Sequence, residues 1–197
     1  MLAVELGSSL AALVGRKLAS FTNAAVVVAD FDQWTASPGS FDTVVAATSF
    51  HWLEPSSRVA RCAALLRPGG SLAIIETRWG VGVSDDPFVT ASQICYAHWT
   101  ADHDPAFRQV RPEEVTPVCL DATMPEIAVV AHHRYLVARE YSAAGYCDLL
   151  STFSDVLVLA PCSRAGFLAC ISNLIDSEFG GKVVRNDLYD LSVARRV

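Results

Sequence analysis

Apolar residues in the first 76 positions form two kinds of pattern, continuous runs and helically spaced sets. The continuous runs predict buried strands at Leu2 to Glu5, Ala24 to Ala29, Phe41 to Thr48 and Ser71 to Glu76. The spaced sets predict helices at Leu10 to Phe21 and Pro55 to Leu66. Apolar strands that alternate with helices are typical of a mostly parallel sheet covered on both faces. The pattern therefore predicts an α/β fold.

The pattern changes between residues 78 and 126, where five prolines interrupt the chain. This region predicts an inserted helix with loops, which could serve as a lid or a substrate region. Beyond it, the periodicity predicts strands and helices in turn at Ile127 to Arg139, Tyr146 to Phe153, Arg164 to Phe179 and Val183 to Arg195. We expect a single domain over residues 1–197, in three parts that cover 1–77, 78–126 and 127–197.

Composition limits the kinds of partner. The chain has 197 residues, 52% of them hydrophobic, and a formal net charge of −6. Such a length allows one full core. The negative charge disfavours binding to the phosphates of nucleic acids. A small molecule or a protein is the expected partner.

The termini and the cysteines indicate the compartment. The apolar N-terminus lacks the basic segment of a signal peptide and carries Glu5 there, and no run reaches the roughly 20 apolar residues of a membrane span. The six cysteines lack the spacing of a zinc site or the density of a disulfide scaffold. We therefore expect a cytoplasmic protein with reduced thiols, no bound metal and no membrane contact.

One segment carries a family pattern. Residues 41–70 read FDTVVAATSFHWLEPSSRVARCAALLRPGG, a strand, a helix and a glycine turn in succession. Pro68 prevents the helix from continuing, and Gly69 and Gly70 allow a sharp turn into the next strand. In this order the segments resemble class I, Rossmann-like methyltransferases that use S-adenosylmethionine and act on small molecules. The resemblance implies a mostly parallel sheet with an antiparallel C-terminal strand, and a cofactor-binding half at residues 1–77.

The resemblance also implies cofactor-binding residues at the carboxyl ends of the strands, where ligands bind in open α/β sheets. Glu5 corresponds to the acid that accepts hydrogen bonds from the ribose hydroxyls. Asp30 and Phe31 correspond to the pair that holds the adenine, through a carboxylate and a backbone amide. A solvated Glu5 and a simple strand-to-helix cap by Asp30 are the structural alternatives.

The segment after the third predicted strand would lie beside the sulfonium of the cofactor. Ser49 and Trp52 are expected to contact the cofactor there, with the aromatic ring facing its cationic methyl group. His51 is the candidate catalytic residue, because an imidazole can act as a general base near neutral pH. The alternative is that His51 and Trp52 only pack the loop.

The chain departs from the family at its start. The glycine-rich loop that follows the family's first strand is absent, and Met1 corresponds to the beginning of the second strand. We expect a chain truncated at its N-terminus, with exposed sheet edges that promote homo-oligomers. The alternative function is a non-catalytic or decayed relative that no longer binds the cofactor well. A nicotinamide-dependent oxidoreductase is a third hypothesis, since that class also binds a ribose with an acid, but the motif succession disfavours it.

Overall fold

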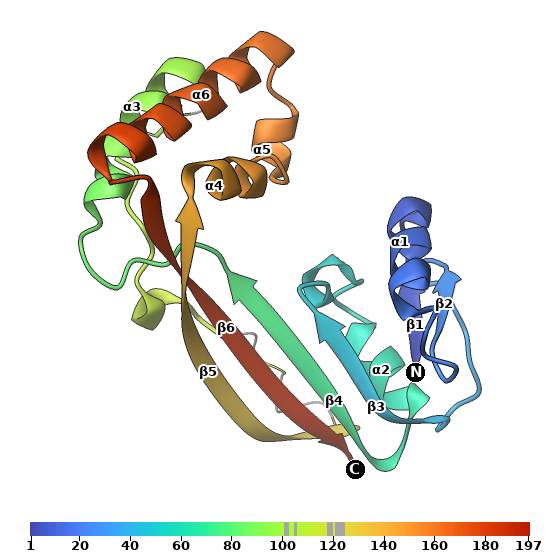
Figure 1. The fold of residues 1–197 in the computed structure, drawn as a ribbon. Helices are drawn as coiled ribbons and strands as arrows, with labels where there is room; N and C mark the ends of the chain where they lie inside the picture. Colours follow the sequence, from blue (N-terminus) through green and yellow to red (C-terminus); the bar gives the residue numbers. More distant parts are fainter. Residues whose placement is uncertain (101–102, 105, 118–119, 121–124) are drawn as a thin grey trace. The chain divides into compact units, whose positions relative to one another are not determined.

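The computed structural model describes residues 1–100, 103–104, 106–117, 120 and 125–197 (Figure 1). The chain forms two compact units. The first unit contains Met1–Glu76, Val118–His133 and Asp190–Val197, and the second contains Thr77–Pro117 and Arg134–Tyr189. The organisation as a single domain in three parts stays a prediction.

The strands form two sheets. Strand β1 (Leu2–Glu5) pairs in parallel with β2 (Ala25–Val28), and β3 (Phe41–Ala47) pairs in parallel with β4 (Leu66–Arg78). The second sheet has the order β3-β4-β6-β5, with β5 at Ile127–Ser142 and β6 at Lys182–Arg196. Strand β6 runs opposite to β4 and β5 (Figure 1). The predicted α/β fold, mostly parallel in its first half with an antiparallel last strand, is confirmed.

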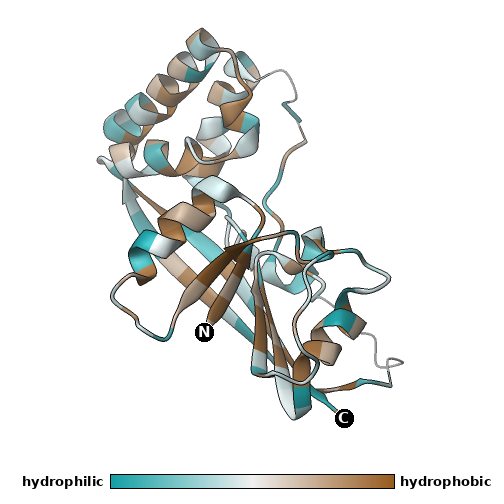
Figure 2. Cartoon of the chain, turned by 90° about the vertical axis from the view of Figure 1, so that its right-hand side faces the viewer, coloured by the Kyte–Doolittle hydropathy of each residue, from teal (hydrophilic) through white to brown (hydrophobic). Residues whose placement is uncertain are grey.

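The helices of the first unit follow the predicted positions. Helix α1 spans Ser8–Leu18, the short helix η1 spans Phe50–Trp52, and α2 spans Arg58–Leu65. Phe50, Leu66 and Leu72 are almost fully buried in the core of this unit. Strands β1 and β2, beside the N-terminus, are hydrophobic along their length (Figure 2). None of their residues is fully buried, so the prediction of buried strands is wrong for these two runs.

The glycine turn lies inside β4. Phe41 pairs with Leu66 but Thr43 pairs with Ser71, so two steps along β3 correspond to five along β4. Gly69 adopts a left-handed conformation, with φ of 75°, as a sharp turn at this glycine allows. The sequence placed this segment between a helix and a strand; hydrogen bonding to β3 on both sides of it instead makes it an irregularity within the strand.

The second unit contains four helices among its described residues: α3 (Pro87–Trp99), α4 (Ala143–Leu150), α5 (Ser154–Leu157) and α6 (Pro161–Glu178), with the short helix η2 at Pro112–Glu114. Helix α3 packs against α6 in the opposite direction. At one end a Cβ on Gly166 would lie 2.3 Å from the Trp99 ring, and at the other the Phe88 and Phe179 rings meet edge to face at 5.4 Å. Glycine at position 166 therefore permits the close approach of the two helices.

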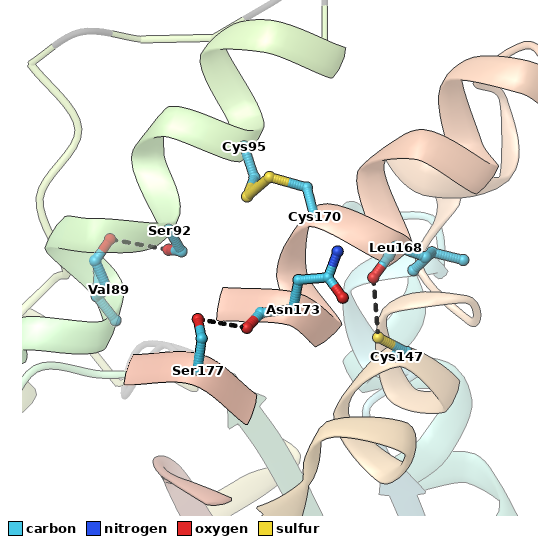
Figure 3. The surroundings of a disulfide bond; sticks show 8 residues. All are labelled: Val89, Ser92, Cys95, Cys147, Leu168, Cys170, Asn173 and Ser177. Carbon is cyan, nitrogen blue, oxygen red and sulfur yellow. Dashed lines mark hydrogen bonds between the residues drawn. A yellow bond between two sulfur atoms is a disulfide. The ribbon is translucent and has the colours of Figure 1, made fainter. Parts of the chain in front are cut away.

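Between these two contacts the helices are joined covalently. Cys95 of α3 and Cys170 of α6 form a disulfide, with 5.8 Å between their Cα atoms (Figure 3). The expectation that all thiols are reduced is therefore wrong. Spacing along the chain cannot reveal this pair, because 75 positions separate the two cysteines and only the packing of α3 on α6 brings them together.

Candidate functional site

Two acidic residues lie at the carboxyl end of the first sheet. Glu5 pairs with Val28 across the sheet, and the Ala29 amide donates to the Glu5 carbonyl oxygen at 3.0 Å. Asp30 follows directly, so both carboxylates belong to the same edge. The Gly7 amide donates to Glu5 Oε1 at 2.7 Å, and the Asp32 amide donates to Asp30 Oδ1 at 2.9 Å. The backbone therefore orients both side chains.

The loop after β2 is held by helix α2. Arg61 Nη2 donates to the carbonyl oxygens of Phe31 and Trp34, at 2.8 and 2.9 Å. The rings of Phe31 and Trp34 stack, with 6.3 Å between their centroids. The Arg61 guanidinium therefore fixes the backbone at Phe31 and Trp34.

The loop after β3 begins at a strained residue. Thr48 has a φ of 51°, in the left-handed region that a β-branched side chain rarely adopts. Its amide donates to the Ile75 carbonyl oxygen at 2.7 Å, which ties the loop to β4. Phe50 is buried, and Arg58 lies over its ring at 4.5 Å and donates to its carbonyl oxygen at 3.0 Å. Phe50 and Arg58 anchor the loop.

His51 faces an acid that the sequence analysis did not select. His51 Nδ1 lies 3.5 Å from Glu76 Oε2, and the histidine and glutamate side chains are 46% and 15% exposed. The Trp52 side chain is 80% exposed, and its ring lies 4.9 Å from that of His51. Ser49 is exposed as well. This loop therefore presents a serine, a histidine and a tryptophan at the surface.

A hydrogen bond joins the two loops. The Glu54 amide, just after η1, donates to Asp32 Oδ2 at 3.0 Å. We call the two connected loops, with the strand ends that carry them, the rim: the first loop carries the predicted residues Asp30 and Phe31 after the strand end at Glu5, and the second carries Ser49, His51 and Trp52.

Five further residues of this rim escaped the sequence analysis. They are Asp32, Glu54, Arg58, Arg61 and Glu76. The two arginines are three residues apart on a predicted helix, a spacing that places them on one face. Glu76 ends an apolar run that predicts a strand, as Glu5 does. The spacing of the two arginines and the acid at the end of an apolar run were both visible in the sequence. Neither feature shows which residues these side chains contact.

The rim is acidic. Its carboxylates belong to Glu5, Asp30, Asp32, Glu54 and Glu76, while both arginines donate to backbone carbonyl oxygens. Among residues outside the gaps in the description, no group of three histidine, cysteine or acidic side chains could hold a metal ion. Within the same residues, no helix is long and apolar enough to cross a membrane.

Comparisons with known proteins agree with this architecture. Residues 2–74 match the sequence model of a family described as "methyltransferase domain". Among curated protein sequences, none matches the chain significantly.

Solved structures share the fold. A protein described as a candidate type II methyltransferase from Anaeromyxobacter dehalogenans superposes with a TM-score of 0.59 at 18% identity, covering 99% of this chain and 79% of its own. A candidate methyltransferase from Bacillus halodurans gives 0.51 at 14% identity, with 98% and 81% covered. The YcgJ protein of Bacillus subtilis gives 0.52 at 12% identity, with 99% and 81% covered.

The strand order, the acids at the strand ends and these likenesses define a Rossmann-like fold of the class I methyltransferase type. Within this fold, residues 2–74 are the part of the chain that is similar to the methyltransferase domain family.

Proposed function

We propose that the protein transfers a methyl group from S-adenosylmethionine to a small molecule. The observation that carries the proposal is the placement of Glu5 and Asp30 side by side at the carboxyl end of β1 and β2. Such an edge is where open α/β sheets bind nucleotides. When bound, S-adenosylmethionine supplies an electrophilic methyl group on a sulfonium ion.

The rim residues have the hydrogen-bonding groups that S-adenosylmethionine requires. The Glu5 carboxylate can accept hydrogen bonds from ribose hydroxyls, and Gly7 keeps it oriented. Asp30 can accept from an adenine amine, and the Phe31 amide can donate to a ring nitrogen on a backbone that Arg61 fixes. The exposed Trp52 ring and the acidic rim both favour a cationic ligand.

Calorimetry of the full chain tests this proposal. We expect micromolar binding of S-adenosylmethionine and of its demethylated product, and at least tenfold weaker binding by Glu5→Gln, because the uncharged amide is a weaker acceptor. Glu178→Gln, at the exposed end of α6, is the matched control and should bind normally. Absence of binding by the unmodified chain would reject the proposal.

A second candidate is a non-catalytic binding protein. It is favoured by the separation of β1 and β2 from the sheet that contains β3, which leaves unpaired strand edges for a partner. The same calorimetry separates the two, because this candidate predicts no binding of the methyl donor.

A further inference from the structure

The contact between His51 and Glu76 joins two strand ends. His51 lies in η1 after β3, and Glu76 lies in β4 next to Ile75, whose carbonyl oxygen binds the Thr48 amide. The distance of 3.5 Å from His51 Nδ1 to Glu76 Oε2 is that of an ion pair when the imidazole is protonated. Neither residue belongs to the nucleotide-binding positions proposed above.

Glu76 and Asp32 are the two rim acids that each have one buried carboxylate oxygen without a hydrogen-bond partner among the described residues, and of the two Glu76 is the one that faces His51. Its Oε1 atom is shielded from solvent, and no hydrogen-bond donor of the described residues reaches it. A buried carboxylate oxygen without a donor is costly, and a neighbouring positive charge reduces that cost. The environment of Glu76 therefore favours a partner that acquires a proton.

The backbone supports the same geometry at a conformational cost. Thr48 is the only non-glycine residue of the described chain with a positive φ. This turn starts the segment that places His51 at Glu76. Strained residues persist where the surrounding structure fixes them, and they cluster at functional sites.

We infer that Glu76 is the positioning residue of His51, and that the pair takes the proton from a hydroxyl acceptor during methyl transfer. The inference rests on the proposed function. A carboxylate at Nδ1 favours the tautomer that carries its proton there, so Nε2 keeps its lone pair. His51 is about half exposed, so an acceptor can reach this atom.

The proton and the bonds balance in this step. The acceptor oxygen forms a bond to the methyl carbon as the bond from that carbon to sulfur breaks. The hydroxyl proton moves to Nε2, and the Glu76 carboxylate stabilises the resulting imidazolium. The products are a methyl ether, the thioether of the donor and protonated His51, which returns its proton to solvent.

The acidic rim narrows the acceptor class. Of the charged groups near His51, Glu76 faces it from β4, while Arg58 of α2 is bound to the Phe50 carbonyl. An ionised carboxylate acceptor would be repelled by Glu76 and would need no base. An alcohol or a phenol, which is neutral and must lose a proton, fits both properties.

Nitrogen-15 NMR of histidine-labelled full chain tests the pair without cofactor or acceptor. The spectrum distinguishes the two ring nitrogens by their proton, and His51→Gln assigns the resonances. In the neutral ring we expect the proton of His51 on Nδ1, and a shift towards Nε2 in Glu76→Leu. Glu54→Gln, an exposed acid of the same rim, should leave the spectrum unchanged.

A wild-type His51 with its proton on Nε2 would overturn the inference, even if Glu76→Leu does not fold. So would a folded Glu76→Leu variant with an unchanged tautomer. Where methyl transfer is measured, Glu76→Leu should lower the rate to hydroxyl acceptors at least tenfold at unchanged donor affinity. Failure of the donor to bind, with the Nδ1 proton in place, would reject the methyl transfer reaction and not the pair.

Discussion

Arg61 of helix α2 donates to the carbonyl oxygen of Phe31 at 2.8 Å, and so fixes a loop that precedes it by 30 residues. The same guanidinium nitrogen also donates to Trp34. We expect Arg61→Met to lower the free energy of unfolding by about 2 kcal/mol, because hydrogen bonds to a charged donor are lost from a partly buried position. Affinity for S-adenosylhomocysteine should fall with it, as measured by denaturation and calorimetry.

The control for this change is Arg67→Met. Arg67 is mostly exposed and forms a surface ion pair with Asp42, a kind of contact that contributes roughly 0–1 kcal/mol. Equal effects of the two substitutions would contradict the role assigned to Arg61.

The disulfide between α3 and α6 makes a prediction about thiols. Unfolded protein without reductant should show two thiols fewer than the six cysteines of the sequence. Among the native thiols, Cys162 is exposed and should react quickly. Burial raises the pKa of the Cys62 thiol to about 12, so Cys62 should react slowly. Ellman's reagent measures the number of thiols in the unfolded chain and the reaction rates of Cys162 and Cys62 in the native one.

The same disulfide should stabilise the chain. Cys170→Ser is expected to lower the free energy of unfolding by roughly 2–4 kcal/mol, because the bond closes a long loop in the unfolded chain. Cys162→Ser, on the same helix, is the control and should have little effect. A reductant that leaves the unfolding transition of the wild type in place would show that the bond contributes nothing.

Two glycines with different backbones should respond oppositely to alanine. Gly69 has a φ of 75°, so Gly69→Ala should cost about 1 kcal/mol through backbone strain. Gly15 lies inside α1, and a Cβ there would meet no atom within 4 Å. Gly15→Ala should therefore stabilise by about 0.5–1 kcal/mol through helix propensity. Urea denaturation measures the change in the free energy of unfolding for each variant. Changes of the same sign in both variants would contradict this prediction.

The unpaired edge of β3 should promote self-association. Val45 on this strand is 59% exposed, although a continuous apolar strand is normally covered on both faces. We expect sedimentation to show oligomers at high concentration, and Val45→Lys to reduce them, because a charge protects an exposed edge. Val158→Lys, at an 81% exposed position after α5, should not. A wild-type chain that stays monomeric contradicts this prediction.

Acid should weaken the ion pair between Arg108 and Glu114 in the second unit. The hydrogen bond from Arg108, with a backbone amide at Arg111, lowers the pKa of Glu114 from 4.5 to about 2. Because the folded value is the lower one, the contact stabilises the fold above pH 4.5 and is lost as pH falls from 4.5 towards 2. The carboxyl resonance of Glu114 at low salt should titrate accordingly, and Arg108→Met should raise the pKa of Glu114 part of the way back towards 4.5, because the Arg111 amide still lowers it.

Much of this architecture could be read from local patterns. Val26 and Val44 stand within continuous apolar runs, which can be buried only between two layers, and both belong to parallel strands. Glu5, Asp30 and His51 were found because strand ends mark the binding edge of such a sheet. The roles proposed for them remain predictions.

Contacts between distant segments decided the rest. The sequence determined the α/β alternation, the glycine turn and the acids at the strand ends, because each depends on neighbouring residues and on the periods of helix and strand. Only the tertiary structure decided that Arg61 holds Phe31, that Cys95 bonds to Cys170 and that Glu76 faces His51. The two residues of each pair belong to separate elements, and they meet only because those elements pack against each other. The spacing of residues along the chain does not predict such a contact.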